Sequence, residues 1–226
     1  MTRSDRSVGT LIGIIPIALI IGVWQAIAAS GLAPPSLLPA PAAVFARLVQ
    51  QLGSPAYLDH VATTLFRLFT GFAIAVVIGV TIGLAATGSR AVEGVVRPLV
   101  RVLAPVPKIA LYPAFILTLG FENASKIALV VADAAFPILL ATYQGTSAVE
   151  PKLAWSARAA GTSPLLCLVT VVLPAALPSV LTGCRIALVI SCIVVFLAEM
   201  IISTDGLGHL LVAPRAAFRP STCSCR

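Results

Sequence analysis

The strongest constraint on this chain is an uncharged apolar stretch that runs from Leu68 to Ser89. Such a stretch is long enough for a helix to cross the roughly 30 Å hydrocarbon core of a bilayer. Lipid offers no hydrogen bonds to the backbone, so a helix is the only reasonable structure for it. Three glycines, Gly71, Gly79 and Gly83, would let another helix approach closely. We therefore predict a membrane-spanning helix over 66–88.

The composition extends this prediction to the whole chain. Of 226 residues, 59% are hydrophobic and 10% are charged, whereas a soluble domain carries roughly 25% charged residues. At about 20 residues per span, the chain has room for five or six helices. The net charge of +7 does not indicate nucleic-acid binding, because the basic residues are sparse and lie between apolar runs. They are better explained as charges that orient membrane helices.

Four more ranges are predicted to cross the membrane, which makes about five spans in a single all-α domain of residues 1–226. The first follows a short basic N-terminus and exceeds the 7–15 apolar residues of a secretory signal, so we expect it to stay uncleaved. The second contains Pro105, Pro107 and Pro113. We expect it to be a kinked helix packed among neighbours. The four ranges are 8–29, 102–121, 127–144 and 179–203.

Two topologies compete for the stretch from Ala159 to Cys184, which is uncharged but carries one glycine and three prolines early on. It either crosses the membrane or forms an apolar cytoplasmic loop. A cytoplasmic N-terminus places seven basic residues inside and leaves two outside before the tail, as the positive-inside tendency requires. The inside residues are Arg3, Arg6, Arg90, Arg97, Arg101, Lys152 and Arg158, and the outside ones are Arg47 and Lys126. This orientation starts the stretch inside and leaves both topologies open.

The beginning of that inside segment has a recognisable pattern. Residues 154–161 read AWSARAAG, and 171–174 read VVLP. This indicates a short helix ended by a glycine, a second short helix, and a proline at the turn into a membrane span. Such a helix pair lies along the membrane surface and offers a compact projection to a partner.

The pattern resembles the EAA loop of the inner-membrane permeases of binding-protein-dependent ABC importers. Ala157, Gly161, Leu173 and Pro174 stand at matching positions, with Val171 at the isoleucine position. Further similar segments extend the resemblance over about residues 59–212, and they favour the nitrate, taurine and alkanesulfonate branch. They include 97–107 with 115–117, LPAALP at 173–178, and 183–188 followed by AEM at 198–200.

The resemblance implies a polytopic helical bundle of the ABC-importer permease type, with 145–178 as a cytoplasmic coupling loop. It favours that topology over a crossing. It also implies a multi-pass protein of the cell inner membrane with a cytoplasmic N-terminus. Those five matching residues would couple to an ABC ATPase subunit. Further partners would be a periplasmic or lipid-anchored substrate-binding protein, a second copy of the permease, and membrane lipid.

The same resemblance implies that no chemistry occurs on this chain. The sequence contains no G-x-x-x-x-G-K-[ST] phosphate loop. ATP and Mg²⁺ would therefore be held by the partner subunit, and the chain itself would be neither an enzyme nor a cofactor protein. Its solute would be small, in this branch an anion such as a sulfonate or nitrate.

Two departures from the family pattern keep other functions open. Trp155 stands where an acidic residue is common, and the tail at 213–226 replaces the apolar last helix, which is apparently missing. The alternatives are an inactive permease remnant, a membrane assembly protein or, less readily, a membrane-embedded enzyme. An enzyme would need a nucleophile–base set or an H-E-x-x-H motif, and neither is present.

Two acidic residues fall at membrane depth, where ionisable groups are costly and commonly face an aqueous path. Asp133 and Glu199 are therefore candidates for a translocation path, together with Arg185. The alternative is that each acid is paired structurally, for instance with Arg185 or Lys108. The two histidines and five cysteines show no ligand pattern, so we expect no metal site.

Overall fold

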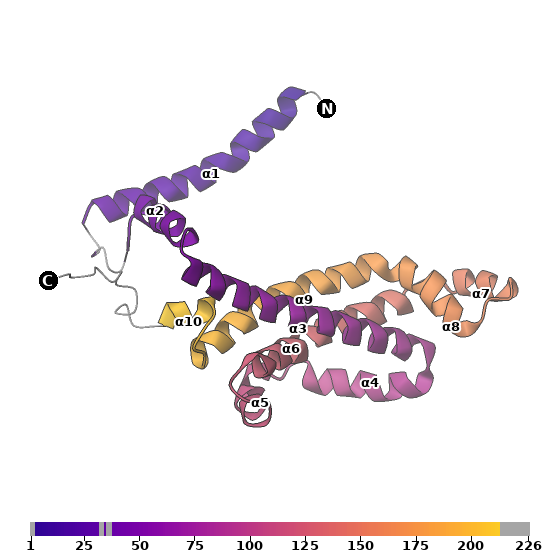
Figure 1. Ribbon diagram of the computed structural model, residues 1–226. Coiled ribbons are helices and arrows are strands. Elements are labelled where there is room, and N and C mark those ends of the chain that lie inside the picture. The colour runs from indigo at the N-terminus through magenta and orange to yellow at the C-terminus, as the bar shows by residue number, and fades with distance from the viewer. Residues whose placement is uncertain (1–2, 32–33, 35–37, 213–226) are drawn as a thin grey trace. The chain divides into compact units, whose positions relative to one another are not determined.

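A computed structural model describes residues 3–31, 34 and 38–212, with side chains from residue 15 onward among these. Every regular element in that part of the chain is a helix (Figure 1). The chain divides into two compact units, Met1–Leu58 and Asp59–Arg226, and each is described by itself. The predicted all-α membrane fold class is confirmed.

The first unit contains α1 (Arg3–Ala29) and α2 (Pro41–Leu52). Helix α1 covers the predicted range 8–29, and its described side chains from Ile15 to Ala29 are apolar except Gln25 and mostly exposed. Gly31 follows α1 with a φ of 72°, a conformation that favours glycine. Helix α2 begins with a proline, which suits a position whose N–H has no partner in the helix.

The second unit is built on three long helices, α3 (Pro55–Gly88), α6 (Asn123–Ser147) and α9 (Leu173–Ile201). Glycines set their close approach. A Cβ placed on Gly79 of α3 would lie 2.8 Å from the Cβ of Ile138 on α6. A Cβ placed on Gly183 of α9 would lie 2.5 Å from the Cβ of Ala141, also on α6. Helix α6 therefore packs backbone to backbone with both of its neighbours, as small residues allow in membranes.

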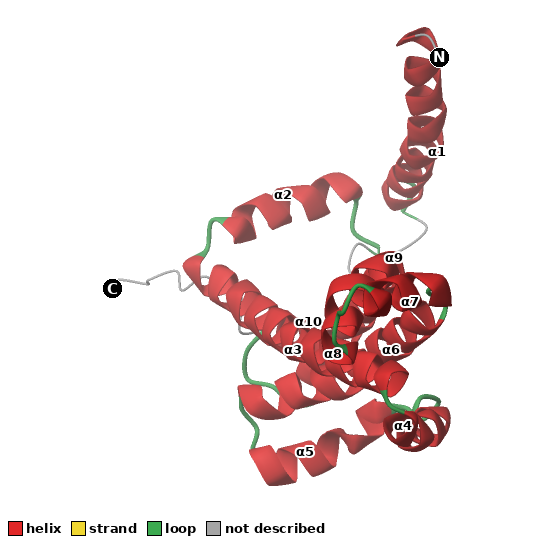
Figure 2. Ribbon diagram, turned by 90° about the vertical axis from the view of Figure 1, so that its right-hand side faces the viewer, coloured by secondary structure: helices red, strands yellow, loops and turns green. Residues whose placement is uncertain are grey.

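The chain does not form one kinked helix over the predicted span at 102–121, and the bounds of that span in the membrane stay a prediction. The chain instead forms α4 (Arg90–Leu103), a break, η1 (Lys108–Leu111) and α5 (Tyr112–Leu119), with a bend of 91° between the two halves. Figure 2 views α4 nearly end-on while α5 lies across the view. Pro105 and Pro107 stand in the break, where each lacks an N–H and disfavours helix in the residue before it.

No break in the helix separates the predicted coupling loop at 145–178 from the predicted span at 179–203, and both sets of bounds stay predictions. Helix α7 (Pro151–Ala159) ends at a turn in which Gly161 has a φ of 87°, as predicted. The second short helix is not separate, because α8 (Pro164–Cys167), the π-helical segment η2 (Leu168–Val172) and α9 form one helix of 38 residues. Pro174 therefore lies within this helix, and the wider π turn makes room for its ring and missing N–H.

Long apolar helices in the described residues account for part of the predicted spans, and α1 enters this comparison only from Ile15 onward. In the described residues, three helices are long and apolar enough to span a membrane, or four if the bent pair counts as one span. About five were expected. The prediction that the last helix is missing concerns residues 213–226, which lie outside the described residues. Cys223 and Cys225 belong to the same range.

The close α3–α6 contact predicts a strong size limit at Gly79. A Gly79→Leu substitution forces a side chain into Ile138, and we expect it to destabilise the protein by about 1–3 kcal/mol. The matched control is Gly94→Leu on α4, because nothing lies within 4 Å of a Cβ there. Thermal unfolding in detergent, followed by gel filtration, measures both. Equal unfolding midpoints for the two variants would contradict the glycine-mediated packing.

Candidate functional site

A buried arginine connects three helical segments at one end of the second unit. Arg67 on α3 is 1% exposed. Its Nη1 donates to Glu199 Oε1 of α9 at 2.8 Å, and its Nε donates to Asn123 Oδ1 of α6 at 2.7 Å. Its Nη2 donates to Asp205 Oδ1, in the turn after α9, at 2.5 Å. One guanidinium therefore links α3, α6 and the end of α9.

The rest of the cluster fastens the turn that follows α9. The Thr64 hydroxyl donates to Glu199 Oε2 at 2.9 Å, and the Gly208 N–H donates to the same oxygen at 3.0 Å. The Gly206 N–H donates to His60 Nδ1 at 3.0 Å. Glu199 is only 1% exposed. Its buried carboxylate is stabilised by a cation, a hydroxyl and a backbone amide. We call the set of Arg67, Glu199, Asp205, Asn123, Thr64 and His60 the Arg67 cluster.

Electrostatics inside the Arg67 cluster favour the ionised state of its more exposed acid. Burial alone would raise the pKa of Asp205, but the hydrogen bond and the charge of Arg67 outweigh it. The pKa of Asp205 is therefore held below its ordinary value. In the predicted orientation this cluster stands at the external end of the membrane helices, opposite α7 and α8 (Figure 1).

The candidate path residues do not come together. Glu199 belongs to the Arg67 cluster. Asp133 on α6 lies 3.6 Å from the Lys108 ammonium, which also donates to Ala104 O at 2.9 Å. Arg185 is exposed on α9. Asp133 and Glu199 are thus both paired. The partner of Glu199 is Arg67, for which the sequence predicted no role. That Asp133, Glu199 and Arg185 line a translocation path stays a prediction.

The predicted coupling residues gather at the other end of the unit. Ala157 lies on α7, Gly161 in the turn, Val171 in η2, and Leu173 with Pro174 at the start of α9. The Thr162 N–H donates to Ala157 O at 3.2 Å, and the Gly161 N–H donates to Arg158 O at 3.0 Å, which closes the helix end. The sulfur of buried Cys167 lies 3.9 Å from Ala154 O and joins α8 to α7. We call residues 151–167 the helical projection.

The helical projection carries exposed apolar side chains. Trp155 is 67% exposed, and Leu153 on α7 and Leu165 on α8 are exposed as well. In Figure 1, α7 and α8 form one end of the second unit and extend beyond α4. A rigid, exposed tryptophan on a short helix is a typical anchor for a protein partner.

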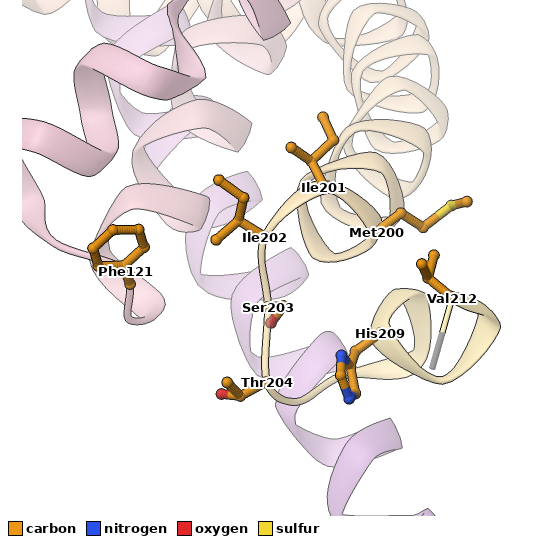
Figure 3. A pocket seen from close by; sticks show the side chains of 8 residues that line it. All are labelled: Phe121, Met200, Ile201, Ile202, Ser203, Thr204, His209 and Val212. Atoms are coloured by element: carbon orange, nitrogen blue, oxygen red, sulfur yellow. The ribbon is translucent and has the colours of Figure 1, made fainter. Parts of the chain in front are cut away.

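A pocket of about 450 Å³ lies at the opposite end, near α10 (Leu207–Val212). Figure 3 shows its lining, with Phe121 on one side of the 200–204 segment and His209 on the other. The lining is mostly apolar, and Ser203 and Thr204 add hydroxyl groups. No group of three or more His, Cys, Asp or Glu side chains suited to a metal occurs among the described residues.

Comparisons with known proteins agree with this architecture. Residues 75–222 match the family model of the binding-protein-dependent transport system inner membrane component. The chain is 32% identical over 207 residues to SsuC of Bacillus subtilis (strain 168), which carries the name of an aliphatic sulfonates transport permease protein. This match covers 92% of the chain and 75% of SsuC. The taurine transport system permease protein TauC of Escherichia coli (strain K12) is 31% identical over 210 residues, covering 91% of the chain and 74% of TauC.

Among solved structures, a similar fold is found in a transporter. It is the methionine ABC transporter MetNI in inward-facing conformations. The match has a TM-score of 0.60 at 21% sequence identity, and it covers 67% of this chain and 76% of that one. This likeness supports the arrangement of the helices.

The Arg67 cluster predicts a large cost for removing one member of its buried ion pair. Glu199→Ala leaves the Arg67 charge without its buried partner, and such losses cost about 3–5 kcal/mol. The double variant Arg67→Met with Glu199→Ala should recover part of that loss, because no lone buried charge remains. Thermal unfolding of the two single variants and the double variant in detergent gives the coupling.

An exposed ion pair supplies the control for this cycle. Lys152 and Glu150 lie 3.3 Å apart with both side chains largely exposed, so Lys152→Ala should change stability little. Additive effects of the two substitutions in the Arg67 cluster would show that Arg67 and Glu199 are not energetically coupled.

Proposed function

The chain belongs to the family of binding-protein-dependent transport system inner membrane components, and from this premise we propose that it is the permease subunit of an ATP-driven importer of a small anionic solute. A sulfonate or nitrate is the expected class. The helical projection carries this proposal, because it gives an ATPase subunit a rigid point of attachment on the cytoplasmic side. ATP and Mg²⁺ would act on that separate subunit.

The connection between the helical projection and the membrane helices supports coupling. Helix α8 continues without a break through η2 into α9, so a displacement of the projection moves a helix of 38 residues. Closure of an ATPase dimer would draw two projections together and tilt the attached helices. The solute cavity would then open toward an external binding protein, which is alternating access driven by binding energy.

The assembly that this mechanism requires is larger than one chain. It comprises a second permease copy, two ATPase subunits and a periplasmic or lipid-anchored substrate-binding protein, all in the inner membrane with the N-terminus of this chain in the cytoplasm. No cofactor is expected on this chain. The names of the relatives favour sulfonates as solutes, since SsuC is named for aliphatic sulfonates and TauC for taurine.

Three residues are proposed to line the solute path. Arg185 is exposed on α9 and offers a positive charge. Asp133 is partly exposed beside Lys108. Glu199 is the most deeply buried of the three, so contact with solute there requires the Arg67 cluster to open. A permease remnant or an assembly protein would need none of these charges.

Trp155 tests the proposed attachment. A Trp155→Ala substitution removes the largest exposed side chain of the helical projection, and we expect recovery of a co-expressed ABC ATPase subunit from the same organism to fall at least about tenfold. Leu117→Ala on α5 is the matched control, because that side chain is 88% exposed and outside the projection. Equal ATPase recovery for both variants would contradict the attachment. An enzyme or a remnant would recover no ATPase with any variant.

Uptake of labelled taurine and ethanesulfonate into vesicles tests the path residues. The variants Asp133→Asn and Glu199→Gln remove a charge with little change of volume, and Arg185→Gln replaces the charge by a shorter polar side chain. We expect Asp133→Asn and Arg185→Gln to lower uptake at least about tenfold at low solute concentration, with unchanged ATPase recovery. Lys152→Gln on the helical projection is the control for lost charge. Wild-type uptake by a variant would rule out an essential charge at its position.

A further inference from the structure

Three arginines form a row along one face of α4. Arg90, Arg97 and Arg101 are seven and four residues apart, and at 3.6 residues per turn they fall within about 40° of one another around the helix. All three are exposed. Val95, Leu99 and Val102, which are also exposed, lie on a different side of the helix. Helix α4 therefore presents one basic face and one apolar face.

The contacts of α4 show how this basic face is oriented. The Tyr143 hydroxyl of α6 donates to Glu93 Oε1 at 2.6 Å, whereas Val100 shares a small hollow with Leu139. Later residues of α4 therefore lie beside earlier residues of α6, which means that the two helices run antiparallel. Helix α4 thus starts beside the end of α6 that leads to the helical projection and runs toward the middle of α6. Over the 11 residues from Arg90 to Arg101, the basic face extends by about 16 Å along the helix.

This face would be unstable against hydrocarbon. An arginine within a membrane helix is costly unless it faces a partner or a water-filled cavity. Arg97 has a partial partner in Glu93, at 3.3 Å. Within the described part of the chain, Arg90 and Arg101 make no ion pair.

Five of the described acids already have partners within the chain, so a second copy offers few free carboxylates. Two of the described acids lie in the Arg67 cluster, and three more are paired with Arg97, Lys108 and Lys152. Of the others, Asp59 and Glu122 lie near the end of the unit that holds the Arg67 cluster, and Asp5 belongs to α1 in the first unit. Water, anionic headgroups and free anions remain as groups that could neutralise the basic face.

We propose that Arg90, Arg97 and Arg101 line the inner part of the solute path and bind the oxyanion group of the solute, of which a sulfonate is the expected class. This inference rests on the proposed function and adds the residues that select for negative charge. Guanidinium groups donate paired hydrogen bonds to planar or tetrahedral oxyanions, which suits them to this role. The row ends at the bend, where Lys108 is already paired with Asp133.

A thiol placed within the basic face tests the proposal without requiring transport. In the full chain with its five native cysteines replaced, Gly94→Cys puts a thiol between Arg90 and Arg97, where space is open. The probes are sulfonatoethyl methanethiosulfonate, an anion, and trimethylammonioethyl methanethiosulfonate, a cation of similar size. Inside-out membrane vesicles are used, so both reagents arrive from the cytoplasmic side.

We expect Gly94→Cys to react with both reagents and faster with the anion. Adding Arg97→Gln and Arg101→Gln should lower the anion-to-cation rate ratio about tenfold, from the loss of two nearby charges. Leu99→Cys, on the apolar face of the same helix, should react slowly with both reagents. An unreactive Gly94→Cys, or a rate ratio that ignores the arginines, overturns the proposal.

Anionic lipid headgroups share the chemistry of the proposed solute, and a second arm distinguishes them. The Gly94→Cys chain is reconstituted in phosphatidylcholine alone and in phosphatidylcholine with phosphatidylglycerol. A path open to free anions gives the same preference for the anionic reagent in both membranes. A preference that disappears when phosphatidylglycerol is present means that headgroups hold the arginines, and it overturns the proposal. Failure of ATPase recovery with wild-type chain would instead count against the proposed function.

Discussion

The buried charge of Arg67 is the interaction on which the second unit depends. A guanidinium removed from water is stable only with matched acceptors, and Arg67 finds them on Glu199, Asp205 and Asn123. Glu199 lies 132 residues away in the sequence. Because a slip of either helix would leave a charge unpaired, this contact sets the register of α3 against α9. It also holds the turn that leads into α10.

Glycine packing makes the remainder of the three-helix arrangement equally specific. Gly79 and Gly183 bring the backbones of α3 and α9 against α6, where no side chain larger than hydrogen fits. The interruptions of regular helix lie elsewhere, in the break after α4, in η2 and at Gly161. The glycine contacts between helices and the interruptions of the backbone therefore lie in different places. A force applied at the helical projection reaches the closely packed helices through η2, the π-helical segment.

The sequence predicted those parts whose structure follows from local chemistry. Three features could be predicted because each depends on a few neighbouring residues. They are the uncharged run in α3, its glycines and the turn at Gly161. Proline was the weak point. Pro105 and Pro107 lie in a break after a helix, whereas Pro174 and Pro178 lie inside one, where a π turn directly precedes Pro174. The partners of Arg67 could not be predicted from the sequence, because they lie far away along the chain. An arginine directly before an uncharged membrane stretch was nevertheless a signal that some buried partner was needed.

The distribution of charge separates two roles that net charge alone confuses. Basic residues that orient a membrane protein need only remain at its cytoplasmic surface. Lys152 meets that condition, because it is exposed on the helical projection beside Glu150. The arginines of α4 instead follow the helix axis toward the middle of α6. Only Arg97 of this row has an acidic partner among the described residues, Glu93, so the row keeps a net positive field. A field of that sign, extended along a helix, selects anions over cations before any specific contact is made.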